Sequence, residues 1–138
     1  GYETCFNLLE RSHPLLKNEP NVLFIDIPKE GKLTVVGDLH GQLTDLLTIF
    51  TRHGLPSPTH TYLFNGDLVN HGRNSCEVAL IIFAFKLLYP SHVFLNRGNH
   101  EAKDLLEVCG FETECLCKYD SFVFDLFCNV FSCLPLAS

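Results

Sequence analysis

Short apolar runs alternate with longer helical patterns along most of this chain. The runs at 33–36, 62–65 and 92–95 are rich in β-branched, leucine or aromatic residues, which is typical of buried strands. Residues 42–53 lie between the first two runs and are predicted to form an amphipathic helix. Its apolar side chains recur at i, i+3, i+4 and i+7: Leu43, Leu46, Leu47 and Phe50. Residues 75–88 are apolar nearly all round and indicate a buried helix.

The two ends of the chain carry different patterns. Residues 2–17 look helical, and Pro14 is expected to end or bend that helix because proline lacks the N–H that a helix needs. Residues 21–27 are predicted as a short strand. From 102 to 133 the pattern is helical again, with a break expected at Gly110.

Alternation of strands and helices predicts βαβ units around a mainly parallel sheet, which makes the fold class α/β. Gly54 is a natural stop for the first crossover helix, and residues 54–59 and 66–74 are predicted loops. The chain divides into a lead-in helix and strand over 1–30 and the βα units over 31–138, all in one domain. Ligands of such sheets gather at the carboxyl ends of the strands.

Composition narrows the class of partner. The chain has 138 residues, 46% of them hydrophobic, so it can bury a core. Its formal net charge is −6 with no basic block, which argues against a nucleic-acid partner. The longest apolar run, Val78–Leu88, is interrupted by Lys86 and is too short to span a membrane. The chain begins at Gly1 and contains no Met, so we expect it to be part of a longer protein.

Seven cysteines are scattered along the chain without the spacing of a disulfide framework. An odd number of scattered cysteines indicates reduced thiols and therefore an intracellular protein of the cytoplasm or nucleus. Cys109, Cys115 and Cys117 have an alternative interpretation as part of a zinc knuckle, but we favour partly buried helix thiols.

Polar side chains with metal-ligand chemistry follow each of the three predicted strands. Asp38 and His40 lie two residues apart, so an extended backbone directs both to one side. Asp67 follows the next strand, and Asn99 and His100 follow the third. Oxygen and nitrogen ligands of this kind suit hard and borderline divalent metals. Taken alone, Asp38 would be interpreted as a helix N-cap. Its occurrence together with the other four residues, each after a predicted strand, favours a metal site.

These residues could assemble a two-metal phosphoesterase site. Asp67 has two carboxylate oxygens and could bridge two cations, while Asn99 offers a carbonyl oxygen to the second. Two metals about 3.5–4 Å apart can clamp a phosphate and lower the pKa of an attacking water to about 7. His100 is then placed to protonate the leaving alkoxide.

Three motifs carry a family resemblance. They read Gly37-Asp38-Leu39-His40-Gly41, Gly66-Asp67-Leu68-Val69-Asn70-His71-Gly72 and Arg97-Gly98-Asn99-His100-Glu101. The chain resembles the metal-dependent serine/threonine protein phosphatases, which have the calcineurin-like metallophosphoesterase sandwich fold, and here it would supply the N-terminal half of that catalytic domain. The resemblance covers residues 20–138. Two further stretches, Phe64–Asp67 and Phe85–Pro90, are similar to the branch that carries tetratricopeptide or EF-hand regulatory segments.

The resemblance implies a role for each motif residue. Asp38, His40 and Asp67 would hold the first metal, with Asp67 bridging to a second metal bound by Asn99, and His100 would be the catalytic proton donor. The metals would be manganese, with iron or zinc as alternatives. The implied reaction is hydrolysis of phosphoserine and phosphothreonine, with a phosphoprotein as substrate and a regulatory domain or subunit as a further partner. Asn99 and His100 would also contact the substrate phosphate.

Two neighbouring positions depart from the family pattern, which continues Asp-Arg-Gly where this chain has Asn70-His71-Gly72. Asn70 can accept a hydrogen bond from His100 but brings no negative charge, so we expect a poorer proton donor. His71 replaces an arginine phosphate clamp and is a shorter, mostly neutral substrate-binding group. Both are interpreted as degraded positions. Arg97 is left with two readings, a phosphate contact or a brace for its loop.

The family also draws two histidines and an arginine from a later half, so the second metal here has only Asp67 and Asn99, and we expect weak binding. Lacking the second sheet, the chain should also expose apolar surface and tend to aggregate or need a partner. We therefore keep two alternatives to the protein phosphatase: an impaired or inactive scaffold that binds partners, and a metallophosphoesterase acting on nucleotides or other small phosphoesters.

Two further groups have a structural interpretation. We expect Glu101 to bond to backbone rather than to take part in catalysis. The phenylalanines of the last helical segment lie at helical spacing and are predicted to pack in the core: Phe122, Phe124, Phe127 and Phe131.

Overall fold

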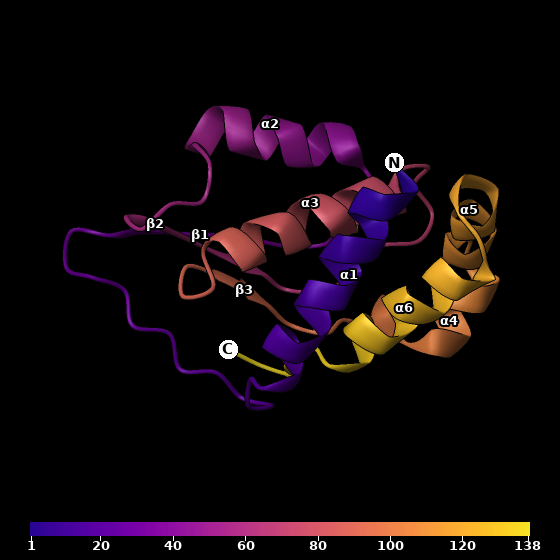
Figure 1. The fold of residues 1–138 in the computed structure, drawn as a ribbon. Helices are drawn as coiled ribbons and strands as arrows, with labels where there is room; N and C mark the ends of the chain where they lie inside the picture. The colour runs from indigo at the N-terminus through magenta and orange to yellow at the C-terminus, as the bar shows by residue number, and fades with distance from the viewer.

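A computed structural model describes residues 1–138 and shows an α/β fold around a three-stranded parallel sheet. The strands β1 (Lys32–Val36), β2 (His60–Phe64) and β3 (Val93–Leu95) lie side by side in that order. The helices α2 (Leu43–His53) and α3 (Ser75–Leu88) connect them (Figure 1). The predicted βαβ units and parallel sheet are therefore confirmed.

Helix α3 lies at the centre of the fold because it is apolar on several sides. Its Val78, Ala79, Ile82 and Phe83 are fully buried. Helix α1 (Tyr2–Lys17) packs across α3 and against α6 (Ser121–Ser132), as Figure 1 shows. The strand side chains Val36, Phe64 and Leu95 point into the same core.

The C-terminal helical region has one more break than the sequence suggested. Helix α4 (Lys103–Val108) ends before Gly110, which adopts a left-handed backbone with φ 108°, as expected of a glycine break. Helix α5 (Phe111–Lys118) then ends before Asp120, whose side chain accepts a hydrogen bond from Val123 N–H (2.8 Å) and so begins α6. This second break was not predicted.

Near the N-terminus one prediction is wrong, and one of the two effects expected of Pro14, an end to the helix, does not occur. Pro14 does not end α1, because the helix continues to Lys17 and buries Leu16 completely. Residues 21–27 do not form a strand: only Val22 makes a bridge, to Ala137, and Phe24 is 93% exposed. The segment has apolar residues but no neighbouring strand with which to share a ladder of hydrogen bonds.

One face of the sheet is open. Leu33 and Val35 of β1 are 42% and 59% exposed, whereas the sequence suggested a fully buried strand. In the register of the sheet Val35 lies beside Leu63, and Leu63 beside Phe94, and these two are only partly buried. The helices cover the opposite face alone, so β1 is buried on one side only.

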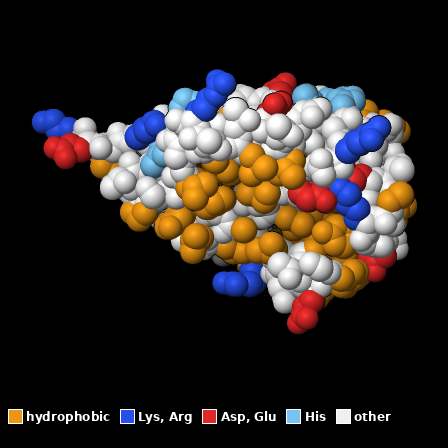
Figure 2. Space-filling model, turned by 90° about the horizontal axis from the view of Figure 1, so that it is seen from above, with side chains coloured by type: hydrophobic (Ala, Val, Ile, Leu, Met, Phe, Trp, Pro, Cys, Tyr) orange, Lys and Arg blue, Asp and Glu red, His pale blue; other side chains and the backbone are white.

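A second apolar surface lies on the helical side. A groove between α1 and α2, with α3 as its floor, is lined by side chains such as Leu8, Leu43, Leu80 and Ile81. Figure 2 looks down on this side and shows hydrophobic side chains gathered across it. No helix of the structure is long and apolar enough to cross a membrane.

The cysteines form no metal site, and most of the phenylalanines of the last helical segment are buried. All seven cysteines are unpaired, and none belongs to a group of three or more metal-ligating side chains, so the zinc-knuckle interpretation of Cys109, Cys115 and Cys117 is not supported. Phe124, Phe127 and Phe131 are buried as predicted, but Phe122 is 54% exposed and is not a core residue.

Candidate metal centre

The structure brings Asp38, His40 and Asp67 together at the carboxyl end of the sheet. Asp38 and His40 follow β1, and Asp67 follows β2. Their ligating atoms all lie within 4.8 Å of one another, and His40 Nε2 is 3.5 Å from Asp38 Oδ2. Two carboxylates and one imidazole at this separation form a donor set that a divalent cation can occupy.

The ring of His40 is oriented for binding a cation. Its Nδ1 lies 3.2 Å from the carbonyl oxygen of Val69, which can only accept a hydrogen bond. Nδ1 therefore donates to Val69, and Nε2 is the ring nitrogen that faces Asp38. Metal-binding histidines in proteins commonly have this arrangement, with the other ring nitrogen donating to a carbonyl group.

The side-chain amide of Asn99 lies against Asp67. With its nitrogen on that side, the amide donates to the two carboxylate oxygens of Asp67 at 3.3 and 3.1 Å. The opposite orientation would place a carbonyl oxygen beside this carboxylate, and oxygen donors of these two kinds suit a divalent cation. The residues present therefore fit a metal at this position.

Glu101 holds the backbone that carries Asp67. Its buried carboxylate accepts hydrogen bonds from the backbone N–H groups of Asp67 (2.8 Å), Leu68 (2.7 Å) and Gly98 (2.8 Å). Burial raises the pKa of the Glu101 carboxyl, and these N–H groups oppose the rise. Glu101 thus joins the loop after β2 to the loop after β3, which is the structural role suggested by the sequence.

The two loops approach too closely to accept a side chain at Gly98. A Cβ atom there would collide with the backbone and side chain of Asp67. The backbone N–H of His100 also donates to Asp67 Oδ1 (3.0 Å). Asp67 is therefore held from both ends by the motif after β3.

Arg97 contacts its own loop. Its guanidinium lies 3.4 Å from the carbonyl oxygen of Glu101, and its backbone N–H donates to Pro135 O (2.7 Å). Of the two roles considered for Arg97, the contacts present are those of a brace.

Asn70 is fixed in one orientation by two backbone groups. Its side-chain Oδ1 accepts a hydrogen bond from Phe111 N–H (3.1 Å), and its Nδ2 donates to the carbonyl oxygen of His100 (3.2 Å). The same Nδ2 lies 3.1 Å from His100 Nδ1. Asn70 therefore donates to the imidazole, whereas the sequence led us to expect it to accept.

His71 and His100 complete the surroundings of His40. The three rings stand edge-on to one another, with centroids 5.3 Å apart for His40–His71, 4.7 Å for His40–His100 and 5.0 Å for His71–His100. Their nitrogens are near enough to share a metal. However, Nδ1 of His100 already lies 3.1 Å from Asn70 Nδ2, so we regard this trio as neighbours of the metal centre rather than as a second one.

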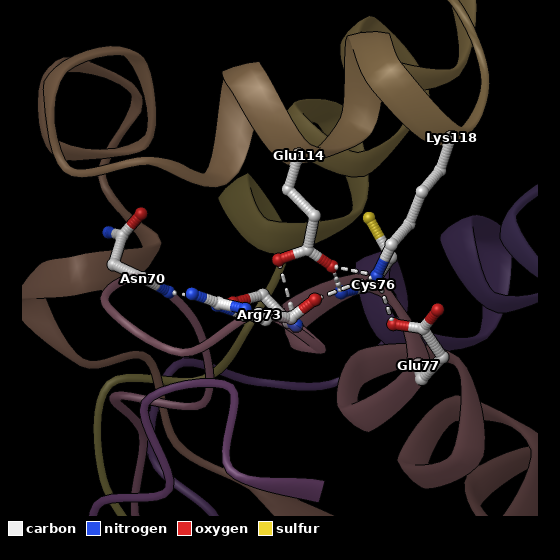
Figure 3. Close-up of polar contacts among 7 residues, drawn as sticks. Asn70, Arg73, Cys76, Glu77, Glu114 and Lys118 are labelled. Carbon is white, nitrogen blue, oxygen red and sulfur yellow. Dashed lines mark hydrogen bonds and ion pairs between the residues drawn. The ribbon is translucent and has the colours of Figure 1, made fainter.

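Helix α5 supports the far end of the loop that carries these residues. Asn74, at the start of α3, makes no side-chain cap. Instead Glu114 of α5 accepts hydrogen bonds from the backbone N–H groups of Ser75 (3.0 Å) and Cys76 (2.8 Å), as Figure 3 shows. Ser75 Oγ in turn accepts from Asn70 N–H (3.1 Å), which links the cap to the metal-centre loop.

Lys118 completes this support. Its ammonium group donates to the carbonyl oxygen of Arg73 (2.8 Å) and forms ion pairs with Glu77 (2.7 Å) and Glu114 (2.8 Å). The sequence gave no signal for this role of Glu114, because a glutamate inside a helix is ordinary and its partners lie almost forty residues away.

Comparison with known proteins shows the family of the chain. The family model for calcineurin-like phosphoesterases matches residues 31–138. The chain is 49% identical over 134 residues to serine/threonine-protein phosphatase T of Schizosaccharomyces pombe, covering 97% of the chain and 28% of that protein. It is 45% identical over 133 residues to human serine/threonine-protein phosphatase 5, covering 96% of the chain and 27% of that protein.

A solved structure shows the same fold. A Saccharomyces cerevisiae protein serine/threonine phosphatase, described as similar to human phosphatase PP5, matches with a TM-score of 0.95 and 39% sequence identity. The match covers 98% of this chain and 44% of that one. The chain thus spans less than half of the length of these similar proteins.

Proposed function

The chain belongs to the calcineurin-like phosphoesterase family, and on that premise we propose that it provides the metal-binding part of a site that hydrolyses phosphoserine and phosphothreonine in proteins. The observation that carries the proposal is the convergence of Asp38, His40 and Asp67 at the carboxyl end of the sheet. Relatives with 45–49% identity are named as serine/threonine-protein phosphatases, which favours a phosphoprotein as substrate.

Each residue has a role in the proposed reaction. Asp38, His40 and Asp67 would hold one divalent ion, and Asp67 with Asn99 would hold a second. When bound, two such ions supply positive charge to the phosphoryl oxygens and acidify the attacking water. Manganese is our first choice, with iron or zinc as alternatives. Carboxylate, amide and imidazole ligands suit all three metals.

The remaining residues face the substrate. His71 is exposed at the rim of the centre and would contact the phosphate, together with Asn99 and His100. Arg97 would act on the phosphate only indirectly, through the loop that it braces. Water would add to phosphorus and lose a proton as the ester P–O bond breaks, and His100 would give a proton to the departing alkoxide oxygen.

Two alternative functions are kept. Asn70 and His71 favour an impaired enzyme that keeps the fold and binds partners, since neither brings the charge of an aspartate or an arginine. The family description alone would also fit a metallophosphoesterase acting on nucleotides or other small phosphoesters, but the names of the relatives favour a phosphoprotein substrate. A regulatory domain or subunit is a further proposed partner.

Three substrates separate these functions. A longer chain that carries the complete catalytic domain should hydrolyse p-nitrophenyl phosphate with added Mn²⁺, and a phosphopeptide faster than a dinucleotide. Asp67→Asn should abolish hydrolysis in the same longer chain. Lack of Mn²⁺-dependent hydrolysis by that chain would support the scaffold, and faster cleavage of the dinucleotide would support the small-phosphoester enzyme.

The double change Asn70→Asp with His71→Arg, made in a longer chain that carries the complete catalytic domain, should raise phosphatase turnover. It restores a carboxylate beside His100 and a forked cation for the phosphate. Groups of these kinds contribute roughly 10²–10⁴ in rate, so turnover should rise at least about tenfold. Unchanged turnover would refute the interpretation of these positions as degraded.

A further inference from the structure

We propose that one face of helix α5 positions the loop of residues 70–74, the His71 loop, and that Lys118 is thereby a positioning residue for binding of the substrate phosphate. The inference rests on the proposed function, because His71 is the residue of this loop that would contact the phosphate. It goes beyond that function by assigning a part in substrate binding to a side chain that acts through the loop alone.

Helix α5 meets the His71 loop with three residues of one helical face. Phe111, Glu114 and Lys118 recur at i, i+3 and i+7, so they lie on the same side of the helix. At one end of the contact, the backbone N–H of Phe111 donates to Asn70 Oδ1 (3.1 Å). At the other end, Lys118 donates to the carbonyl oxygen of Arg73 (2.8 Å), as Figure 3 shows. One helix therefore holds the loop at both ends.

Lys118 joins the loop to two carboxylates. Its ammonium group pairs with Glu114 Oε1 (2.8 Å) and with Glu77 Oε2 (2.7 Å) while it donates to Arg73. Glu114 in turn accepts from the backbone N–H of Ser75 (3.0 Å), directly after the loop. Removal of the ammonium group would leave two carboxylates close together without their shared cation, and like charges at short range repel. The Arg73 carbonyl would lose the same donor.

The His71 loop also lies directly on the backbone of the metal ligand His40. The N–H of Gly72 donates to His40 O (2.8 Å), and the N–H of Asn74 donates to Gly41 O (3.2 Å). A Cβ atom at Gly72 would lie 2.4 Å from His40 O, so the two loops are in close contact. The position of the loop on this backbone therefore decides where His71 lies beside the metal centre.

The backbone of His71 depends on contacts of this kind. Asn70 and His71 both have a left-handed backbone, with φ of 72° and 69°. Such conformations cost energy and persist only where the surrounding structure holds them. The His71 side chain is exposed, so its place is set by the backbone that carries it. We therefore expect loss of the Lys118 ammonium group to displace His71 and to weaken phosphate binding.

Kinetics of Lys118→Met test this role in the longer chain that carries the complete catalytic domain. Methionine keeps most of the apolar stem and removes the charge. The Lys118 side chain is 30% exposed, and exposed ion pairs contribute little to stability, so the variant should fold. With a phosphoserine peptide and Mn²⁺, both KM and the Ki of inorganic phosphate should rise about 5- to 100-fold, since misplacing a positioned group by about 1 Å can cost about 10²-fold.

The split between KM and kcat separates positioning from a general loss of structure. Glu101 holds the backbone of Asp67 independently of α5, so kcat should change by less than about twofold. Lys118→Arg keeps the cation and should retain most of the affinity for phosphate. Lys17→Met, at an exposed position in the last turn of α1, is the matched control and should change neither KM nor kcat.

A double-mutant cycle tests whether Lys118 acts through His71. His71→Ala removes the proposed phosphate contact, so Lys118→Met should raise KM no further in that background. Equal effects of Lys118→Met with and without His71, or an unchanged KM in Lys118→Met, would overturn the inference and leave the proposed function standing.

Hydrogen exchange tests the contact with α5 without any catalysis. In the same longer chain, Lys118→Met should speed exchange of the backbone amides of residues 70–76 at least about tenfold, and Lys17→Met should not. Unchanged exchange in Lys118→Met would overturn the inference whatever the activity. If the parent chain hydrolysed no phosphopeptide, the proposed function would be contradicted, and exchange alone would then decide whether Lys118 holds the loop.

Discussion

Four residues other than glycine adopt a left-handed backbone, and all four belong to the candidate centre. They are His40 (φ 45°), Asp67 (φ 51°), Asn70 (φ 72°) and His71 (φ 69°). Such conformations cost energy for residues with a side chain and persist only where their surroundings hold them. Asp67 N–H donates to the Glu101 carboxylate and Asn70 N–H donates to Ser75 Oγ, and these hydrogen bonds provide that support.

Glu101→Gln should weaken metal binding. One carboxylate oxygen becomes an NH₂ group, so at least one of the three backbone N–H donors loses its acceptor and the Asp67 backbone is held less firmly. Groups that orient metal ligands typically contribute 10–100-fold to affinity, so the Kd for Mn²⁺ measured by calorimetry should rise at least about tenfold. Glu107→Gln, at an exposed position of α4, is the matched control. Equal affinity in both variants would contradict this role.

At single positions the sequence predicted which residues come together better than it predicted the direction of their hydrogen bonds. Asp38, His40 and Asp67 could be placed together because each follows a strand of one parallel sheet. That Asn70 donates to His100 could not be predicted, because its orientation depends on Phe111 N–H, which lies 41 residues further along the chain.

The elements of this fold depend on contacts between helices that are distant in sequence. Helix α3 begins and ends at the residues predicted from its apolar pattern, but its N-terminal cap comes from Glu114 of α5. The predicted strand at 21–27 failed for the same kind of reason: its local pattern suits a strand, but no neighbour pairs with it. Apolar periodicity predicts elements well where they face the core. It predicts strands poorly where their formation depends on a neighbouring strand.

Glu114→Ala should destabilise the fold. The change removes the acceptor of two N–H groups at the start of α3, and losing a helix cap typically lowers the free energy of unfolding by about 1–2 kcal/mol. Urea denaturation followed by circular dichroism would measure the loss. Glu112→Ala removes a charge from the same helix without removing a cap, and should change stability by less than about 0.5 kcal/mol. Similar losses in the two variants would count against the cap.

For the molecule as a whole, helices cover only one face of the sheet. The residues of the other face, Leu33 and Val35, project apolar side chains into solvent. Exposed apolar patches of this kind mark contact surfaces or sites of aggregation. The family resemblance predicted exposed apolar surface, but the pattern of β1 alone did not place it on Leu33 and Val35, because that pattern is the same whether one or two layers cover the strand.

Replacing Leu33 and Val35 by threonine should reduce self-association without loss of stability. Threonine keeps the preference for a strand while removing apolar surface. Sedimentation velocity over a range of concentrations would report the change. Val36→Thr alters the buried face instead, where Val36 is 4% exposed, and should lower stability by about 1–3 kcal/mol without changing association. A parent chain that stays monomeric at all concentrations would contradict the prediction.

The most direct test of the metal centre is anomalous diffraction from crystals of the chain grown with Mn²⁺. We predict a strong peak in contact with Asp38, His40 and Asp67, and a weaker one beside Asp67 and Asn99, about 3.5–4 Å from the first. Manganese bound elsewhere, or none at this position at saturating Mn²⁺, would contradict the account.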